Sequence, residues 1–313
     1  MKEINNNIKQ IIYLYWFNKK GKYGNFGDEL GPYLIEKISG NQIYQIKINR
    51  TGFKLILAYL KGLFFGHYNL NIYKNIIKTL KLNGNHIISI GSIIGWGSGR
   101  RIVWGSGILF KNEKISDGKF LAVRGKYTQK RLLELGYDCP SIFGDPALLL
   151  PLVYNPIVQK THKVGMIPHH TQYKHFANYE KKHGIKVINL IGDIEDIIIQ
   201  ILSCENIISS SLHGLIVPHA YGIPSLWYEY PKIKWKGENI KFLDYFSSVG
   251  IKEYDPIILK EIEKFNINEE LVNFAENSEF LNINSDLKNI QNKLLEAAPF
   301  HVLEEVFNCK QNL

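Results

Sequence analysis

This sequence of 313 residues contains no pattern typical of disulfides, metal clusters or membrane spans. The three cysteines, Cys139, Cys204 and Cys309, are far apart, odd in number and never in a CxxC pair. That pattern argues against a disulfide framework and against a zinc site. The histidines show no zincin spacing, so we expect no metal and no cofactor. Reduced, mostly buried thiols in the cytosol are the resulting expectation.

Acidic residues are also outnumbered, with 29 Asp and Glu against 38 Lys and Arg, for a formal net charge of +9. Such a surplus favours anionic partners such as phosphates, nucleic acid or an acidic membrane surface. The chain is rich in Ile, Asn and Lys together, so a general surface charge is the simpler interpretation. No compact basic run alternates with aromatic residues, and we therefore expect no nucleic acid as a partner.

Long apolar runs are missing as well. The run Ile11–Phe17 is not followed by a small-residue cleavage site and is typical of a core strand. The run Phe53–Gly66 is too short to cross a bilayer and carries Lys54 and Lys61. A buried helix is one interpretation of it, and a helix on a membrane surface is the other. We expect a cytoplasmic protein, with peripheral attachment at the inner face of the membrane as the second option.

Strand-like and helix-like segments alternate along the whole chain, which favours parallel sheets with crossover helices. Strands are expected at Ile11–Phe17, Gln42–Ile48, His86–Ile90, Arg101–Trp104, Lys119–Val123, Lys163–Ile167, Lys186–Leu190, Asn206–Ser209 and Ser225–Tyr230. Helices are expected at Asp28–Ile38, Ile72–Leu82, Lys126–Leu135, Thr171–Lys182, Ile194–Leu202 and Leu215–Tyr221, with one or two more in Ser285–Phe307. The fold class is therefore α/β.

A break in this pattern at Pro151 and Pro156 predicts a domain boundary. We expect two Rossmann-like, doubly wound domains, residues 1–155 and 156–284, with helices of residues 285–313 packing across their junction. Ligands of such domains bind beyond the carboxyl ends of the parallel strands. The polar residues that directly follow strands are therefore the candidate site residues.

In the first half, three segments meet this criterion. The segment Gly24–Leu30 holds Asp28, which can cap the following helix or accept a proton from a hydroxyl. The glycine-rich run beginning Gly91-Ser92 can cradle an anion with its amides, but it matches neither a dinucleotide fingerprint nor a P-loop. Arg124 ends a strand just before a helix, where it can form a salt bridge or bind a carboxylate or phosphate in a bidentate fork.

In the second half, the run Ser209-Ser210-Ser211-Leu212-His213-Gly214 joins a strand to a helix. Hydroxyls, a titratable ring and a helix N-terminus make an anion pocket with a proton donor. A structural cap with a packed histidine is the alternative. His169 also follows a strand and is expected to face the cleft.

The order of these motifs resembles the polysaccharide pyruvyl transferase family over roughly residues 20 to 250. The motifs that carry the resemblance are Asn25-Phe26-Gly27-Asp28, Gly91-Ser92, Val123-Arg124-Gly125, Gly144-Asp145-Pro146, Ser211-Leu212-His213-Gly214 and Ala220-Tyr221-Gly222-Ile223-Pro224. The resemblance implies a glycosyltransferase-B-like pair of domains, phosphoenolpyruvate as donor, and a pyruvylated sugar of a cell-surface polysaccharide as product. It also implies a sugar acceptor, which we expect to be lipid-linked at the inner membrane surface.

Through the same resemblance, the donor-binding arginine corresponds to Arg124 and the donor-site histidine to His213. Many members have an arginine where this chain has Ser211, so another basic residue is needed, with Arg100, Arg101 and His169 as candidates. We expect His213 to act as acid and Asp28 as base. The predicted substrate-binding residues are Arg124, Ser211, Leu212, Gly214, Gly91, Ser92, Asn25 and His169.

Two other functions stay open on the sequence alone. A nucleotide-sugar glycosyltransferase of the same fold would need an acid late in the second domain, for which Glu229 is the candidate. A binding module for an anionic glycan would need no titratable pair. The oligomeric state, the acceptor sugar and the linkage have no signal in the sequence.

Overall fold

The computed structural model describes residues 10–17, 23–46, 86–96, 100–177, 185–231, 239–259 and 280–308. It contains two five-stranded sheets, with strand orders β2-β1-β3-β4-β5 and β10-β9-β8-β6-β7. Every strand pairing within these ranges is parallel. In each sheet the first strand of the sequence lies inside the sheet, so the strand order reverses beside it. Ligands of such α/β folds bind in the crevice beyond the carboxyl ends of the strands at this point.

The first sheet is built from residues before position 123. Its strands are β1 (Ile11–Tyr15), β2 (Gln42–Gln45), β3 (His86–Ile88), β4 (Arg101–Trp104) and β5 (Lys119–Ala122), accompanied by α1 (Phe26–Ser39) and α4 (Lys126–Glu134). Helix α1 buries Leu30, Leu34 and Ile38, which recur every fourth residue and so lie on one face. It ends at Gly40, whose φ of 65° is the left-handed conformation that glycine adopts without steric cost.

The second sheet follows from residue 162 onward. Its strands are β6 (His162–Ile167), β7 (Lys186–Val187), β8 (Cys204–Ser209), β9 (Ser225–Glu229) and β10 (Ile257–Ile258), accompanied by α5 (Tyr173–Phe176), α7 (Ile194–Leu202), α8 (His213–Ala220) and α9 (Ile240–Val249). Asp193 caps α7, since its carboxylate accepts from the amides of Glu195 and Asp196.

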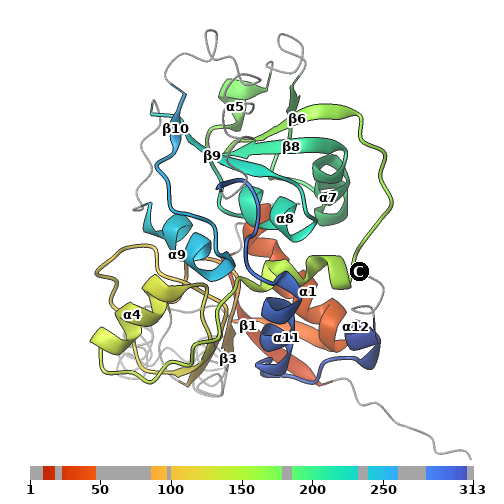
Figure 1. The fold of residues 1–313 in the computed structure, drawn as a ribbon. Helices are drawn as coiled ribbons and strands as arrows, with labels where there is room; N and C mark the ends of the chain where they lie inside the picture. Colours follow the sequence, from red (N-terminus) through yellow and green to blue (C-terminus); the bar gives the residue numbers. More distant parts are fainter. Residues whose placement is uncertain are drawn as a thin grey trace, which may run out of the picture.

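A buried 3-10 helix, η1 (Pro146–Leu152), connects the two sheets. It packs against α8 and α1, and its leucines belong to one apolar core that contains side chains from both halves. The C-terminal helices α11 (Leu287–Glu296) and α12 (Glu304–Asn308) return to the first half, as Figure 1 shows. Trp104 Nε1 donates to the carbonyl of Leu294 at 2.8 Å, and the amide of Leu303 donates to Ile38.

The expected strands and helices are largely found, and their limits differ mainly at the ends. The structure adds three elements that periodicity did not indicate, namely η1, α9 and β10. Of the two prolines at which the domain boundary is predicted, Pro151 lies in η1 and is buried, whereas Pro156 lies beyond the end of this helix. The helix expected at Ile72–Leu82 and the run Phe53–Gly66 lie outside the described residues. The domain limits at 155 and 284 stay predictions.

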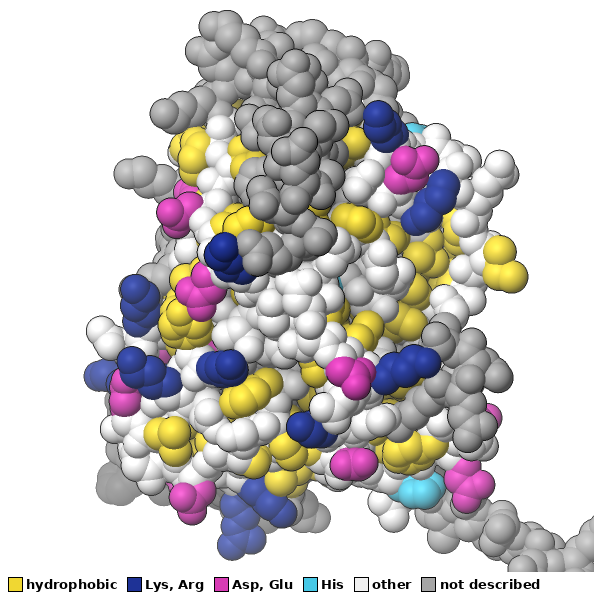
Figure 2. Space-filling view, in the orientation of Figure 1, with side chains coloured by type: hydrophobic (Ala, Val, Ile, Leu, Met, Phe, Trp, Pro, Cys, Tyr) yellow, Lys and Arg dark blue, Asp and Glu magenta, His cyan; other side chains and the backbone are white. Residues whose placement is uncertain are grey.

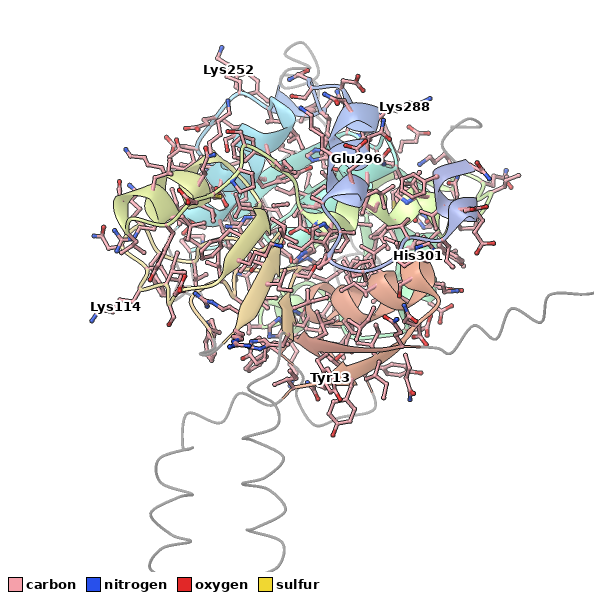
Figure 3. The ribbon with its side chains drawn as sticks, turned by 90° about the horizontal axis from the view of Figure 1, so that it is seen from below. Tyr13, Lys114, Lys252, Lys288, Glu296 and His301 are labelled. Carbon is pink, nitrogen blue, oxygen red and sulfur yellow. The ribbon has the colours of Figure 1, made fainter. Side chains whose placement is uncertain are left out.

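The surplus of positive charge is spread out on the face shown in Figure 2, where Lys and Arg side chains alternate with Asp and Glu. Figure 3, seen from below, likewise places Lys114, Lys252 and Lys288 at separate parts of the periphery. This distribution agrees with a general surface charge. Of the helices in the described ranges, none is long and apolar enough to pass through a bilayer.

Candidate active site

A cavity of about 490 Å³ lies where the two halves meet, at the carboxyl ends of β3, β6 and β8. Eight of the ten predicted site residues line it: Asn25, Asp28, Gly91, Ser92, His169, Ser211, Leu212 and His213. The structure thus brings together residues that are up to 188 positions apart in the sequence (Asn25 to His213). Arg124 and Gly214 do not line it. Lys241, His170 and several apolar side chains complete the wall.

The imidazole of His213 has close neighbours on two sides. Its Nε2 lies 3.6 Å from Oδ2 of Asp145, whose side chain is fully buried. The other carboxylate oxygen, Oδ1, accepts from the amide of Ala147 at 3.0 Å and so caps η1. On the opposite side, a Cβ atom on Gly27 would lie only 2.3 Å from Nδ1 of His213. The buried carboxylate therefore faces one ring nitrogen, and the ring edge with Nδ1 fills the space that a side chain on Gly27 would need.

Asp28 lies in the first turn of α1, which begins at Phe26 with Asn25 as its N-cap. The interpretation of Asp28 as the cap was therefore wrong. Its Oδ2 accepts from the side-chain amide of Asn25 at 3.1 Å. Burial and the negative charge of Asp28 raise the pKa of the adjacent Glu29. The first turn of α1 thus presents one carboxylate, Asp28, to the cavity.

The loop after β8 is ordered by its own hydroxyls. Ser209 Oγ donates to the carbonyl of Ile167 and accepts from the amide of Ser211 at 3.0 Å. Ser210 Oγ accepts from the amide of His169 at 2.9 Å, which joins the loops that follow β8 and β6. Helix α8 then begins at the cavity, and the amides of a first helical turn lack helical partners and can bind an anion.

Gly214 has a packing role. A Cβ atom there would lie 2.2 Å from Ser209 Oγ and 2.8 Å from Ile167 Cγ2. Its missing side chain lets α8 approach β6 and β8 closely, so the residue lies behind the cavity wall.

Arg124 is fully buried behind Ser92. Its Nε donates to Oδ2 of Asp244 at 3.0 Å, one terminal nitrogen to Ser92 Oγ at 2.6 Å, and the other to the carbonyl of Ile108 at 2.7 Å. Asp244 lies on α9, so the ion pair joins the first half of the chain to the second. The structure thus confirms the interpretation of Arg124 as a salt-bridge partner. Direct donor binding by this residue stays a prediction.

The glycine that follows Arg124 fits the same contact. A Cβ atom on Gly125 would lie 1.7 Å from the backbone oxygen of Asp244. The close approach of α9 to the start of α4 therefore requires glycine at this position.

The sequence interpretation missed two residues of the site. Lys241 lies on the unforeseen helix α9, is buried, and lines the cavity. Burial, with the positive charge of Arg124 as the smaller cause, lowers the pKa of Lys241 to about 7. Asp145 was noted only as part of the Gly144-Asp145-Pro146 motif. The Asp-Pro pair at the break between the two series of strands was the available signal for Asp145, whereas Lys241 had none.

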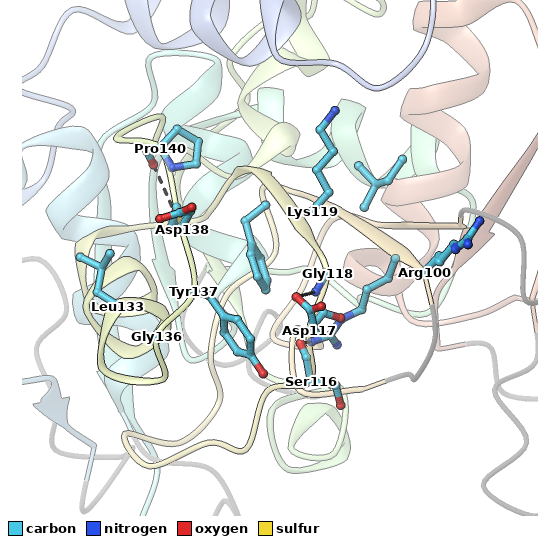
Figure 4. A pocket seen from close by; sticks show the side chains of 14 residues that line it. Arg100, Ser116, Asp117, Gly118, Lys119, Leu133, Gly136, Tyr137, Asp138 and Pro140 are labelled. Atoms are coloured by element: carbon cyan, nitrogen blue, oxygen red, sulfur yellow. Dashed lines mark hydrogen bonds between the residues drawn. The ribbon is translucent and has the colours of Figure 1, made fainter.

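A second, larger cavity of about 1300 Å³ lies away from the predicted site residues. Figure 4 shows it open between Arg100 and Lys119 on one side and Leu133 and Asp138 on the other. Arg101 and Lys119 begin β4 and β5, so it lies at the amino ends of these strands. Ligand sites of parallel sheets occur at the opposite end. We therefore place the candidate active site in the smaller cavity.

The location of the candidate site also excludes two of the basic residues considered as replacements for the arginine missing at Ser211. Arg101 donates to the backbone carbonyls of Ile94, Trp96, Ser116 and Asp117 and holds loops in place. Together with Arg100 it lines the larger cavity, so neither supplies the charge missing at Ser211. His169 does line the active-site cavity. Glu229, the acid required by the nucleotide-sugar alternative, is exposed and is not a lining residue.

Within the ranges that the structure describes, no three His, Cys, Asp or Glu side chains are grouped to hold a metal ion.

The chain is similar to known proteins in both its sequence and its family profile. An uncharacterized protein of Acanthamoeba polyphaga mimivirus is 33% identical over 175 residues, which are 53% of this chain and 61% of the viral protein. The profile of the family described as polysaccharide pyruvyl transferase matches residues 25–232. This match contains both strand-to-helix loops of the cavity, with Asn25, Asp28 and His213, and well over half of the chain. The chain therefore belongs to the polysaccharide pyruvyl transferase family.

Proposed function

We propose that the chain is a transferase that moves a pyruvyl group from phosphoenolpyruvate to a pair of sugar hydroxyls, forming a ketal on a polysaccharide or its lipid-linked precursor. One observation carries the proposal. His213 and Asp28, a proton donor and a proton acceptor from opposite halves of the chain, line one cavity together with the N-terminus of α8. A glycosyltransferase-B-like arrangement of two Rossmann-like halves is part of this proposal, with the donor on the second half and the acceptor on the first.

The negative charges of the proposed donor indicate which groups of the cavity would bind it. Phosphoenolpyruvate carries a phosphate and a carboxylate, and the first-turn amides of α8 with the hydroxyl of Ser211 favour such an anion. Ser92, held by Arg124 at 2.6 Å, and the backbone of Gly91 lie in the wall contributed by the first half. His169 adds a further ring from the loop after β6.

The chemical step begins with a proton transfer from His213 to the methylene carbon of the donor. The neighbouring carbon then carries oxocarbenium-like positive charge, and a sugar hydroxyl attacks it while Asp28 accepts the hydroxyl proton. The proton transfer is assigned to the imidazole and not to one of its nitrogens, because Nε2 lies beside Asp145 and Nδ1 packs against Gly27. Asp145 positions the ring in the way that a carboxylate positions a catalytic histidine.

Bond cleavage completes the reaction. The bond between the central carbon and the phosphate oxygen breaks, and the second hydroxyl closes the ketal. Of the two hydroxyl protons, one restores the proton that His213 gave to the methyl carbon, and the other leaves with phosphate. The products are one ketal and one inorganic phosphate, with no change in oxidation state.

The test is an incubation of the protein with phosphoenolpyruvate and a panel of synthetic and lipid-linked galactosides. We expect phosphate release that depends on an acceptor, and a product whose mass exceeds that of the acceptor by pyruvic acid minus water. His213→Gln is expected to lose activity by roughly 10²–10⁴-fold, which is the usual size of general acid catalysis. Acceptor turnover with sugar nucleotides and none with phosphoenolpyruvate would contradict the proposal.

A further inference from the structure

Phe17 places an apolar ring in the wall of the candidate active site. It follows β1 by two residues, and β1 is the strand beside which the order of the first sheet reverses. The residue therefore lies at the carboxyl edge where ligands of such sheets bind. It lines the cavity and still exposes 43% of its surface. No step of the reaction described above uses it, yet an exposed ring at this position can bury the apolar surface of a substrate.

The neighbours of Phe17 hold its ring in place. Its centroid lies 6.4 Å from that of Trp96 with the planes at 68°, which is the edge-to-face arrangement that aromatic rings favour. The carbonyl of Trp96 accepts from the buried guanidinium of Arg101 at 3.1 Å. The preceding residue, Trp16, packs against the main core, and its carbonyl accepts from Gln45 at 3.3 Å. A ring held in this way loses little conformational freedom when a ligand covers it.

The same cavity also contains groups that bind hydroxyls. Asn25 and Asp28, at the start of α1, line it from the same half of the chain as Phe17. An apolar ring together with a carboxylate and an amide matches a pyranose, because a pyranose has hydroxyls around its rim and a face of C–H groups. The family of the chain implies a polysaccharide acceptor, which is built of sugar rings. A lipid chain has no hydroxyls for Asn25 and Asp28, so the sugar is the better match.

We propose that Phe17 is a specificity-determining residue, whose ring stacks against the C–H face of the acceptor pyranose. The inference rests on the proposed function and adds an acceptor subsite to it. Stacking on one face leaves the hydroxyls at the rim of the sugar free to face Asp28, the proposed base. Because the ring carries no charge, its removal should weaken binding of the acceptor and leave binding of the anionic donor unchanged.

The experiment measures binding of simple sugars to the full chain by ligand-detected NMR titration. The probes are the methyl pyranosides of galactose, glucose and mannose, together with the open-chain alditols of the same three sugars. An alditol carries hydroxyls but has no ring face to stack. The wild type should therefore bind at least one pyranoside clearly more tightly than the corresponding alditol.

Three variants assign this preference to Phe17. Phe17→Ala removes the ring and is expected to weaken pyranoside binding about tenfold, because apolar surface is no longer buried. Phe17→Tyr keeps the ring and should retain most of the affinity. Phe110→Ala removes a ring that is also exposed, to 39%, but does not line the cavity, and it should bind as the wild type does. Calorimetry should show equal affinity for phosphoenolpyruvate in all four proteins.

The outcomes separate this inference from the proposed function. Equal pyranoside binding by the wild type and Phe17→Ala, or no pyranoside binding by the wild type, overturns the inference, and acceptor-dependent turnover of phosphoenolpyruvate then leaves the function in place. If Phe17→Ala weakens binding of a polyprenyl phosphate but not of the pyranosides, the ring binds lipid and the inference is also overturned. Pyranoside binding through Phe17 without any turnover of phosphoenolpyruvate supports the subsite and overturns the function. If Phe17→Ala fails to fold, Phe17→Leu is the second variant without a ring.

Discussion

A Cβ atom on Gly27 would lie 2.3 Å from Nδ1 of His213, so the backbone of α1 rests directly against the imidazole at the start of α8. The two residues come from opposite halves of the chain and are 186 positions apart. Any side chain on Gly27 must therefore displace the ring. The glycine of the Asn25-Phe26-Gly27-Asp28 motif is thereby explained by a contact that the motif itself does not reveal.

Gly27→Ala should therefore abolish most activity while the protein remains folded. We expect a loss of at least 10²-fold in the rate of phosphate release, because the ring is moved from its position beside Asp145. Gly31→Ala, one turn later on α1, is the matched control. Its Cβ atom would meet Leu14 Cδ2 at an ordinary 3.7 Å, so activity should persist and stability should rise by up to about 1 kcal/mol. Normal turnover by Gly27→Ala would show that the reaction does not depend on the position of the His213 ring against α1.

Asp145→Asn tests the positioning of the histidine. An asparagine can still accept from the amide of Ala147 and cap η1, but it no longer offers a negative charge to Nε2 of His213. We expect a thermal midpoint close to that of the wild type and a clear fall in kcat with little change in KM. Asp145→Ala removes the cap as well and should also destabilise the protein by about 1 kcal/mol. If both variants lost only stability, Asp145 would have no role beyond capping.

Arg124→Lys should destabilise the protein and not only weaken donor binding. Lysine cannot reproduce three simultaneous contacts with Asp244, Ser92 and Ile108, and charged hydrogen bonds contribute about 1.5–3 kcal/mol each. Urea unfolding measures the first effect and calorimetry with phosphoenolpyruvate the second. The double variant Arg124→Met with Asp244→Leu should recover much of the stability, because both buried charges are removed together. Recovery of donor affinity in that double variant would count against a role of Arg124 in holding Ser92.

His219 gives a prediction for the dependence of stability on pH. It is fully buried, with Nδ1 bonded to the hydroxyl of Tyr245 and Nε2 to the carbonyl of Leu281, both at 3.0 Å. Burial lowers its pKa to about 4, below the value of 6.5 expected for the unfolded chain. Between these two values the unfolded state therefore binds more protons than the folded state does. Keeping His219 neutral and buried lowers the free energy of unfolding only as the pH falls from 6.5 toward 4.

The variant His219→Gln keeps a donor and an acceptor but does not titrate. The difference in unfolding free energy between the wild type and this variant should be constant above pH 6.5. Below that pH, the wild type should lose about 1.4 kcal/mol of stability relative to the variant for each pH unit. Urea titrations at several values between pH 4.5 and pH 8 measure it. A difference that does not change with pH would show that the pKa of His219 is the same in the folded and unfolded states.

The sequence pattern predicted the two series of strands well because parallel strands are short apolar runs that begin and end at polar residues. Arg101–Trp104 and Ile194–Leu202 were located with their observed limits. Element η1 was missed because its run of prolines and leucines has no helical period, although it is buried on every side. Helix α9 was missed because the polar Lys241, Asp244 and Ser248 lie among its buried residues. Burial of these residues depends on α4, whose contact with α9 is not encoded locally.

The candidate site likewise contains residues that the sequence predicted and residues that it did not predict. Residues that follow strands, such as Ser92, His169 and His213, were predictable because the fold class alone places them at one edge. Gly214 and Arg124 also follow strands but lie behind the wall, because a glycine packed against Ser209 and an arginine paired with Asp244 are decided by tertiary contacts. The Ser211 position lacks a charge, and Lys241 lies in the cavity although it is 30 positions further along the chain.

The ion pair of Arg124 and Asp244 also restricts how substrates reach the cavity. Together with the contact of Gly27 on His213, it ties the two halves at two separate places. A hinge rotation that widened the space between the halves would have to break a buried charge pair, which is far more costly than moving a surface loop. If the proposed function holds, donor and acceptor therefore have to enter the cavity without such a rotation.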